Sequence, residues 1–458
     1  MANDSTELSA AAVSALRARL RGTAILPGDD NYHVARRVWN GAIDRRPSAV
    51  VVCADAEDVA LALRMAAEYE LPFTIRGGGH NVAGRCIRDG ALLLDLSRLT
   101  DVWVNTTSRI ATAQGGALWR GFDAATARYG LATTGGLVST TGIGGFTLGG
   151  GAGWLMRRHG LACDNLLGAN VVLSDGRIIR ATPVEHPDMF WALRGGAGGL
   201  GVVTSFEFQT HPLREVLAGL IIYPADQALR ALQTFRDFAD GAPDEFCGLA
   251  VIANAPPLPF LDPAWHGRPV VIFAVCWCGE RAEGERSLQP LQGAGQPLAE
   301  HLGWMPYVQW QQMQDPAAPP GLGYYWKTAN FSALTDDTLE VLAGAAHHLP
   351  SPRSELHVQH MGGAVARVPR GETAFAHRDA RFFINVIGIT EHAEGVAGLR
   401  ERVRTLYEQI IPGAMPSIMP NFSDQDDEAG PRQFGSDIAQ RLESIRRRYD
   451  PNGLLAIR

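Results

Sequence analysis

The sequence predicts an α+β protein built from two parts, and three observations support this. The chain has 458 residues, which is longer than one hydrophobic core usually serves. Its first part alternates short apolar strands with short helices and glycine-rich loops, without a regular βαβ repeat. From about residue 216, longer alternating segments are separated by helical stretches, which is typical of an antiparallel sheet backed by helices.

Hydrophobic periodicity and turn residues predict the elements of the first part. An opening helix is expected over residues 5–22, with Ser5 or Asp4 as its N-cap, and a second helix over 55–70, with Asp55 as its N-cap. The other elements expected here are a helix over 119–129 and strands over 49–53, 73–76, 92–96, 102–105, 110–113, 166–173, 177–182 and 202–210.

The second part has longer elements. The elements expected here are strands over 217–223, 248–253, 270–278, 357–365 and 382–389, with helices over 225–239, 281–293, 335–348 and 394–410. A last helix over 439–449 carries basic residues near its end and is stopped by Asp450-Pro451-Asn452-Gly453.

Composition and charge argue against several classes of function. The chain is 46% hydrophobic and 19% charged, and its net charge is −7. A nucleic acid or an anionic membrane requires a basic face on its partner, which this balance does not favour. Neither a signal peptide nor an apolar stretch of roughly 18–20 residues is visible. We expect a cytoplasmic monomer or homodimer with no nucleic-acid or membrane partner.

The six cysteines are scattered and do not have the spacing of a small secreted disulfide framework. Cys276 and Cys278 share one face of an alternating strand, where such thiols are usually buried as small hydrophobic groups. A metal site would need more ligands nearby, so none is expected.

Two glycine runs are the most informative feature of the chain. The first, Arg76–Asn81, contains three consecutive glycines followed by His80, and the second spans Gly142–Gly153. Consecutive glycines let the backbone approach a phosphate closely and present N–H groups to it. Neither run has the spacing of a Walker A loop or of the Rossmann fingerprint. The pattern predicts a large, phosphate-bearing cofactor held from two sides.

Further motifs accompany these runs in a fixed order. They are Gly90-x-x-x-x-Asp95-Leu96-Ser97, Gly160-Leu161-Ala162-x-Asp164-Asn165, Asp188-x-Phe190-Trp191-Ala192-x-Arg194-Gly195, Gly199-x-Gly201-Val202-Val203-Thr204, Thr373-Ala374-Phe375-x-His377-Arg378 and Tyr449-Asp450-Pro451-Asn452. Over nearly its whole length the chain resembles the berberine-bridge-enzyme-like FAD-linked oxidases of the vanillyl-alcohol-oxidase superfamily.

The resemblance implies a PCMH-type FAD-binding domain in two parts over residues 1–213, with its core at about 45–213. A substrate-binding domain would follow over 214–409, and a C-terminal segment, 410–458, would return to the FAD domain. His80 would carry the flavin through an 8α-histidyl bond. The cofactor-binding residues implied are Arg76, Gly77, Gly78, Gly79, His80, Asn81, Gly135, Gly136, Gly142, Gly144, Gly145, Gly149, Gly150, Gly153, Val203, Asn421 and Phe422.

The chain departs from the family pattern at two places. Members with a second covalent link carry a cysteine where this chain has Val138, so a single link is expected. Many relatives also carry a tyrosine that helps deprotonate the substrate, and Met419 stands at that position here. Met419 cannot act as a base. An amine that enters neutral can release hydride without a strong protein base, whereas an alcohol usually benefits from one.

Candidate catalytic residues are less well defined. Tyr325 and Lys327 share one face of an expected strand, and Tyr324 and Trp326 share the other. His357 and Gln359 could form a polar row facing a flavin, and Asn421 is retained from the family motif. For the strand residues, sheet packing or a solvated face explains the pattern equally well. The acidic run over residues 424–428 is interpreted as a solvated loop, and His377 and Arg378 as structural.

These observations together predict an FAD-dependent oxidoreductase. The expected reaction passes a hydride from a small organic substrate to flavin N5, with O2 as the acceptor and H2O2 as the product. The expected substrate is an amine, an N-heterocycle or an intermediate of secondary metabolism. The alternatives are a sugar or alcohol oxidase, a dehydrogenase with another acceptor, and a flavin-binding protein without turnover.

Overall fold

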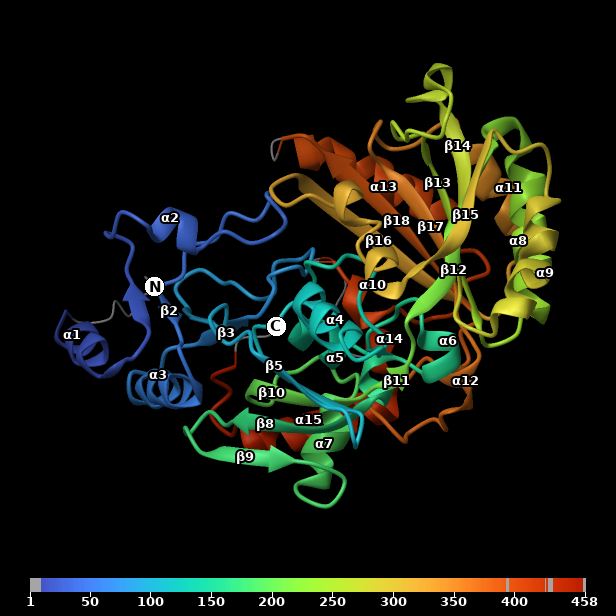
Figure 1. Cartoon of the computed structure of the whole chain (residues 1–458). Coiled ribbons are helices and arrows are strands. Elements are labelled where there is room, and N and C mark those ends of the chain that lie inside the picture. The colour runs from blue at the N-terminus through green and yellow to red at the C-terminus, as the bar shows by residue number, and fades with distance from the viewer. Residues whose placement is uncertain (1–9, 393–394, 425, 427–430, 456–458) are drawn as a thin grey trace.

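The computed structural model describes residues 10–392, 395–424, 426 and 431–455. Within these residues the strands form a four-stranded, a five-stranded and a seven-stranded sheet, together with one isolated strand pair (Figure 1). Helices and sheets of different construction occur in separate parts of the chain, which confirms the α+β class. We call the seven-stranded sheet the large sheet.

The four-stranded sheet is built from the first hundred residues. Its strands, in spatial order, are β1 (Thr23–Ile25), β2 (Ala49–Val52), β4 (Leu92–Asp95) and β3 (Phe73–Arg76). β2 and β3 both run parallel to β4. α1 (Ala10–Arg19), α2 (Tyr32–Ala35) and α3 (Ala56–Glu68) belong to this part. Asp55 caps α3 as predicted, because its side chain accepts a hydrogen bond from the N–H of Asp58.

The five-stranded sheet is antiparallel throughout. Its strands, in spatial order, are β5 (Val102–Asn105), β6 (Ile110–Gln114), β10 (Val202–Gln209), β8 (Leu166–Val172) and β9 (Ile178–Ala181). The short strands β7 (Leu131–Ala132) and β11 (His211–Pro212) pair separately. The helices of this part are α4 (Trp119–Ala127), α5 (Ile143–Leu148), α6 (Met156–His159), η1 (Ala162–Asp164) and α7 (Pro187–Leu193).

The large sheet is also antiparallel, as expected for the second part. Its order is β15 (Ala299–Pro306), β12 (Glu215–Pro224), β14 (Pro269–Trp277), β13 (Phe246–Asn254), β17 (Glu355–His360), β18 (Phe382–Thr390) and β16 (Gly323–Phe331). Shorter elements here are η2 (Ala225–Gln227), η3 (Pro263–Trp265), α10 (Tyr307–Trp310), η4 (Asp315–Ala317) and α12 (Ala364–Arg367).

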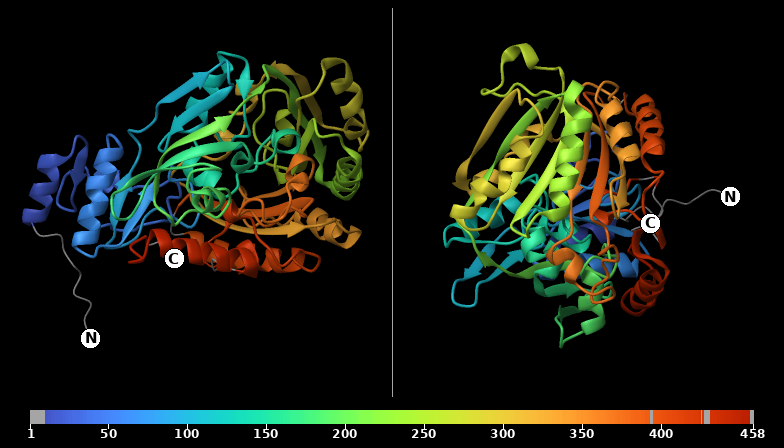
Figure 2. Two further views of the ribbon diagram at one scale, coloured as in Figure 1. Left: turned by 90° about the horizontal axis from the view of Figure 1, so that it is seen from below. Right: turned by 90° about the vertical axis from the view of Figure 1, so that its right-hand side faces the viewer.

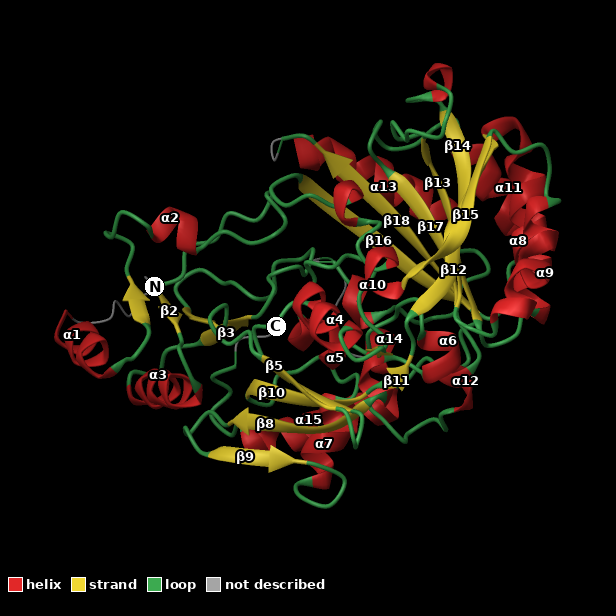
Figure 3. Cartoon of the chain, viewed as in Figure 1, coloured by secondary structure: helices red, strands yellow, loops and turns green. Residues whose placement is uncertain are grey.

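Alternating side chains divide the large sheet into two different faces. One face forms a hydrophobic core with the helices α8 (Ala228–Gly241), α9 (Arg281–Gln292), α11 (Asp336–Ala345) and α13 (Val396–Ile410). The other face packs partly on α6 and the second glycine run. Figure 3 shows α8, α9 and α11 on the outer side of this sheet, with α4 and α5 toward the centre of the molecule. The inner face is therefore the one directed at the glycine runs.

The last part of the chain returns to the first. It contains η6 (Pro420–Phe422), α14 (Pro431–Phe434) and α15 (Ser436–Tyr449). Apolar side chains of α15 share a hydrophobic core with α7 and the five-stranded sheet, and α15 lies along one side of the molecule (Figure 2). Leu455 forms a parallel bridge with Phe73 on β3.

Several expected elements differ from those observed. The predicted N-cap of the opening helix lies outside the described residues. β1, β15 and α5 were not expected; α5 forms inside the second glycine run, between Gly142 and Gly149. The strand expected over 357–365 ends at His360, because Gly362 and Gly363 adopt positive φ angles of 87° and 57° that turn the chain into α12.

The interpretation of the acidic run as a solvated loop is wrong for Asp424, whereas Asp426 is exposed as that interpretation expects. Asp424 is buried, and its carboxylate accepts a hydrogen bond from the backbone N–H of Trp326 at 3.2 Å. Asp426 accepts one from the Tyr325 hydroxyl at 2.6 Å and pairs with Arg404 on α13. These carboxylates hold the C-terminal segment against β16.

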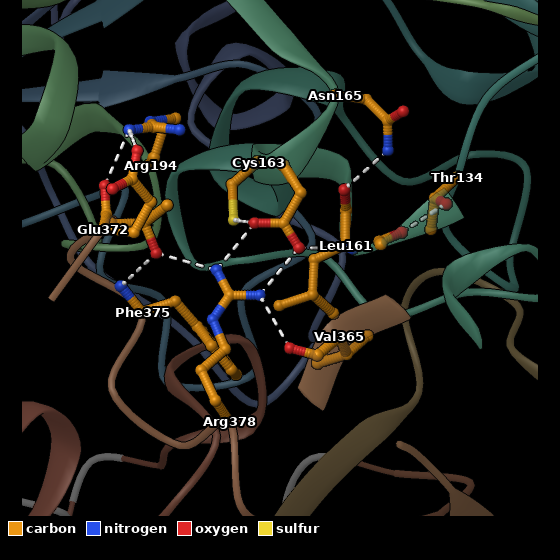
Figure 4. A network of polar contacts seen from close by, with 12 residues as sticks. Thr134, Leu161, Cys163, Asn165, Arg194, Val365, Glu372, Phe375 and Arg378 are labelled. Atoms are coloured by element: carbon orange, nitrogen blue, oxygen red, sulfur yellow. Dashed lines mark hydrogen bonds and ion pairs between the residues drawn. The ribbon is translucent and has the colours of Figure 1, made fainter. Parts of the chain in front are cut away.

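A buried ion pair joins the first part to the loop before β18. The guanidinium of Arg378 donates to both carboxylate oxygens of Asp164, at 2.6 and 2.7 Å (Figure 4). It also donates to the hydroxyl of Thr373 at 2.7 Å. His377, the preceding residue, contacts the carbonyl of Gln433 at 2.6 Å through its ring nitrogen. Both residues have the structural surroundings that the sequence predicts.

Candidate functional site

One large cavity lies between the glycine runs and the inner face of the large sheet. Its volume is about 2320 Å³. Its lining extends from Gly453 and Leu455, near β3, past both glycine runs, to side chains of β16, β17 and β18. Cavities for drug-sized ligands are typically about 300–1,000 Å³. This one is large enough for an extended cofactor and a second small molecule.

The two glycine runs touch each other through their backbones. A Cβ atom on Gly78 would lie 2.4 Å from the backbone nitrogen of Gly142, and one on Gly142 would lie 2.3 Å from that of Gly78. Any side chain at either position would therefore separate the runs. Gly145 differs, because it lines the cavity and a Cβ there would meet no protein atom within 4 Å. The space beside Gly145 is left open for a bound molecule.

Most of the residues expected to bind the cofactor line this cavity. They are Gly77, Gly78, Gly79, His80, Asn81, Gly136, Gly142, Gly144, Gly145, Gly149, Val203, Asn421 and Phe422. The roles of these residues remain a prediction.

Four expected residues are not among those that line the cavity, and each is needed for packing instead. The guanidinium of Arg76 pairs with the buried Asp95 at 2.6 Å. A Cβ on Gly153 would lie 1.9 Å from the carbonyl oxygen of Gly135, and one on Gly135 would lie 2.8 Å from the side-chain nitrogen of Gln311. Gly150 has a φ of 111° and faces the ring of Phe375. Glycine density alone did not distinguish chain packing from ligand contact.

His80 lies on the cavity wall with one ring nitrogen already engaged. Its Nε2 is 2.8 Å from the hydroxyl oxygen of Thr140. The indole of Trp39 stacks on the imidazole, with ring centroids 4.9 Å apart and 19° between the planes. Burial lowers the pKa of His80 to about 4, although the nearby Asp315 acts to raise it. The imidazole is therefore neutral at pH 7.

Asn421 fastens the second glycine run to the C-terminal segment. Its amide Nδ2 donates to the carbonyl of Phe146 at 2.9 Å, and its Oδ1 accepts from the N–H of Gly151 at 3.0 Å. Both polar ends of this side chain are thus used to hold backbone. This arrangement favours a positioning role over the catalytic role for which Asn421 was a candidate.

The structure corrects the choice of face on β16. Tyr325 lies in the core beneath the helices, and Lys327 is paired with Val386 of the same core. Neither is among the residues that line the cavity, so the two are removed as catalytic candidates. Tyr324 and Trp326 line it instead. The alternating pattern shows which two residues share a face of β16. It does not show which of the two faces is directed at the cavity, because that depends on how the strand packs in the sheet.

A polar row on β17 faces the cavity, as the sequence suggested. His357 and Gln359 line it together with Glu355, and the carboxylate of Glu355 lies 2.7 Å from Nε2 of His357. On the neighbouring strand, Asn385 lies opposite His357, and its buried Oδ1 has no hydrogen-bond partner within the described residues. The same holds for the indole N–H of Trp326. These atoms are available to a ligand.

Trp39 is the most important site residue that the sequence did not indicate. It belongs to no motif and lies in an irregular segment, yet its ring also stacks on Tyr324, with centroids 3.8 Å apart. The next residue, Asn40, donates to the carbonyls of Val82 and Tyr324. This segment therefore connects the first glycine run with the large sheet. No local sequence signal could have identified a contact between residues 284 positions apart.

Comparison with known proteins identifies the cofactor. A family model described as an FAD binding domain matches residues 47–182. The (R)-6-hydroxynicotine oxidase of Paenarthrobacter nicotinovorans is 27% identical over 448 residues, which cover 94% of each chain. The open glycine-lined wall beside Gly145 and the size of the cavity fit FAD. The chain is an FAD-dependent oxidoreductase.

Solved structures share the fold over nearly the whole chain. BBE-like 1 of Physcomitrella patens has a TM-score of 0.87 at 20% identity and covers 97% of both chains. The glucooligosaccharide oxidase of Acremonium strictum, which carries a 6-S-cysteinyl, 8α-N1-histidyl FAD, has a TM-score of 0.83 at 23% identity, again covering 97% of both. The chain is thus similar, over nearly its whole length, to PCMH-type and berberine-bridge-enzyme-like FAD-linked oxidoreductases.

Two further features bear on possible partners. Among the described helices, none is both long and apolar enough to cross a membrane. A search of the same residues for clusters of three or more histidine, cysteine or acidic side chains suited to a metal ion found none.

Proposed function

We propose that FAD occupies the cavity, is attached covalently to His80, and accepts a hydride from a small amine or N-heterocycle. The position of His80 carries this proposal, because its imidazole lines the cavity where the first glycine run meets the aromatic side of the large sheet. Bound FAD supplies the redox chemistry, and O2 would reoxidise it with release of H2O2. Val138, at the position of the second link in relatives, leaves His80 as the single attachment point.

In this scheme the chain is divided according to its three sheets. Residues 1–213 form the FAD-binding domain, with a core at about 45–213, and residues 214–409 form the substrate-binding domain. Residues 410–458 return to the FAD domain. The observations that support this division are the limits of the large sheet, Glu215 to Thr390, and the packing of α15 on α7.

The side chains around the substrate end favour an amine. Three aromatic rings, of Trp39, Tyr324 and Trp326, line this end beside the carboxylate of Glu355. Aromatic faces and a carboxylate both attract a cationic nitrogen, by the ring quadrupole and by direct charge attraction. The substrate would lie between the flavin and β17, with Gln359 and the free Oδ1 of Asn385 as hydrogen-bond partners.

His357 is the residue we propose to move the substrate's proton. Glu355 contacts Nε2 of His357 at 2.7 Å, so the carboxylate can orient the imidazole toward the substrate. This pair takes the part that Met419, which is buried and carries no titratable group, cannot take. An amine arriving with its proton would lose it to His357 before hydride transfer.

The same pair supports the second candidate function, oxidation of an alcohol or sugar. A hydroxyl group is a poor hydride donor until a base accepts its proton, and His357 with Glu355 offers one. The aromatic lining and the single link at His80 favour the amine over the alcohol or sugar. A direct test with substrates distinguishes these two functions more sharply.

The test is anaerobic reduction of the purified protein. Acid precipitation first establishes whether the flavin stays with the polypeptide. A panel of cyclic and secondary amines, N-heterocycles, alcohols and oligosaccharides is then added without oxygen, and the flavin absorbance is followed. We expect bleaching by an amine and recovery of colour with H2O2 on admission of air. Bleaching by sugars alone would assign the second function, and bleaching by no compound would favour a flavin-binding protein without turnover.

A further inference from the structure

The turn that precedes the second glycine run is held by five hydrogen bonds. In residues 138–141, the N–H of Thr141 donates to the carbonyl of Val138 at 3.0 Å. The carbonyls of Ser139 and Thr141 accept hydrogen bonds from the N–H groups of Arg120 and Trp119, at 2.9 and 3.0 Å. Asp315, from the loop after α10, accepts from both the N–H and the hydroxyl of Ser139, at 2.7 and 2.6 Å. These hydrogen bonds fix the position of the side chain between Ser139 and Thr141.

Thr140 is the side chain that this turn presents to His80. Its hydroxyl oxygen is 2.8 Å from Nε2 of His80, whereas Thr140 itself is not among the residues that line the cavity. A second contact that restricts the His80 ring comes from Trp39, whose indole stacks on the imidazole. Thr140 thus contacts the edge of the His80 ring, and Trp39 contacts its face. Among the described residues, no hydrogen bond to the other ring nitrogen, Nδ1, is found.

We propose that Thr140 is a positioning residue for covalent attachment of the cofactor: it accepts a hydrogen bond from Nε2–H of His80 and so keeps the lone pair on Nδ1. This inference rests on the proposed bond between His80 and FAD. Only a nitrogen with a free lone pair can form that bond, and a neutral imidazole carries its proton on the other nitrogen. Asp315 adds a negative charge near the ring, which stabilises the cationic imidazole formed as the bond forms.

The step balances as an oxidation. Nδ1 of His80 forms a bond to the carbon of the flavin 8-methyl group. That methyl group gives up one proton and the imidazole gives up another, from Nε2. Two electrons remain on the flavin ring system, and O2 removes them together with two protons to give H2O2. Thr140 takes no part in the electron transfer and acts only through the orientation and tautomer of His80.

The experiment measures attachment directly and does not depend on turnover. Full-length protein is produced in flavin-limited cells, mixed with FAD in air, and precipitated with acid at timed intervals. Flavin in the pellet is covalent, and flavin in the supernatant is not. Thr140→Val removes the hydroxyl at nearly constant volume, and Thr140→Ser restores it. Thr134→Val is the matched control, because its buried hydroxyl donates to the carbonyl of Gly160 and does not contact His80.

We expect Thr140→Val to bind FAD but to attach it at least about tenfold more slowly than the wild type, which corresponds to about 1.4 kcal/mol. Thr140→Ser and Thr134→Val should attach it within about twofold of the wild-type rate. Attachment by Thr140→Val at the wild-type rate would overturn the proposal, as would equal slowing by Thr140→Ser. If Thr140→Val does not bind FAD, Thr140→Ala is judged by the same criterion.

The two proposals fail in different ways. Wild-type protein whose flavin passes entirely into the supernatant would refute the covalent bond and, with it, the role of Thr140. The anaerobic reduction experiment would still test whether the FAD-loaded protein is an oxidase. Covalent flavin in the wild type but none in His80→Ala, combined with normal attachment in Thr140→Val, would refute the role of Thr140 alone.

Discussion

The cavity is bounded by two regions that specify their shapes in different ways. On the side of the glycine runs, backbone contacts backbone, and the absence of side chains at Gly78 and Gly142 permits the geometry. On the side of the large sheet, the backbone is regular, and the choice of inward side chains on β16 and β17 determines the chemistry. The first region should tolerate almost no added atom where the two runs touch. The second should tolerate changes on one face and lose function on the other.

The largest effect is expected where the two regions depend on each other, at the buried pair of Arg378 and Asp164. Arg378→Met would leave the Asp164 carboxylate buried without its partner, at a cost of about 3–5 kcal/mol in the free energy of unfolding. The free energy of unfolding is measured by urea denaturation, with tryptophan fluorescence and the flavin signal as the two probes. Arg177→Met, which breaks the exposed pair with Asp175, should cost less than about 1 kcal/mol. Similar losses for the two variants would mean that the regions are stable independently.

Replacing a glycine by alanine should affect stability differently at glycines that pack against the chain and at glycines that face the ligand. Gly78→Ala places a Cβ 2.4 Å from backbone, and we expect a loss of about 3 kcal/mol of stability. Gly145→Ala, inside α5, meets no protein atom within 4 Å, so the protein without cofactor should be unchanged or up to about 1 kcal/mol more stable. Thermal unfolding with and without FAD is the measurement. If Gly145→Ala is as damaging without cofactor as Gly78→Ala, the distinction between the two glycines is wrong.

On the large sheet, the two faces should respond differently to substitution. His357→Gln removes the proposed proton acceptor and should lower kcat/KM about 100-fold, or about 2.7 kcal/mol, with FAD content unchanged. Tyr325→Phe, on the helix-covered face, should change kcat/KM less than twofold and cost about 1 kcal/mol of stability through lost bonds to Asp426 and Arg404. Steady-state kinetics on the substrate found by the reduction screen decides between them. A larger kinetic effect for Tyr325→Phe would reverse our choice of face.

The last prediction concerns acidity at the junction between the first part and the large sheet, and its effect at pH 7 is the smallest. His159 and His211 stack with ring centroids 3.8 Å apart, and burial lowers their pKa values to about 3 and about 4. The unfolded chain binds protons at these residues near pH 6.5 and the folded chain does not, so stability is lost as the pH falls from about 6.5 towards 4. The slope is at most about 1.4 kcal/mol per pH unit for each histidine.

This prediction is checked by measuring unfolding between pH 7 and 4.5. The double variant His159→Gln/His211→Gln should show a shallower dependence on pH than the wild type. His33→Gln, at an exposed position, should leave the dependence unchanged. An identical slope in the double variant would show that other groups control the acid response.

The sequence was a good guide to the glycine-run region because glycine itself is the signal there. Strands, the Asp55 cap and most cavity-lining glycines were predicted from local pattern and family motifs. Even so, Gly135, Gly150 and Gly153 were assigned to the cofactor although they satisfy contacts between chain segments. Local pattern identifies a position that excludes Cβ, but it does not identify the neighbouring atom.

The large sheet was predicted less completely for a different reason. Alternation on β16 correctly paired Tyr324 with Trp326 and Tyr325 with Lys327, but the facing side depends on tertiary packing against α13. The buried position of Asp424 and the hydrogen bond of Asp426 likewise depend on partners about 100 residues away. Trp39 and Thr140 both contact His80 from positions far away in the sequence, and periodicity does not record such contacts.

The bridge between Leu455 and Phe73 has a consequence for biosynthesis. A ribosome adds residues in order, so β3 exists long before positions 453 and 455, which help to line the cavity, have left the exit tunnel. Tight retention of the dinucleotide should therefore await the synthesis of these two positions. A nascent polypeptide arrested a few dozen residues before this point should be colourless, whereas the released one can mature into a yellow protein.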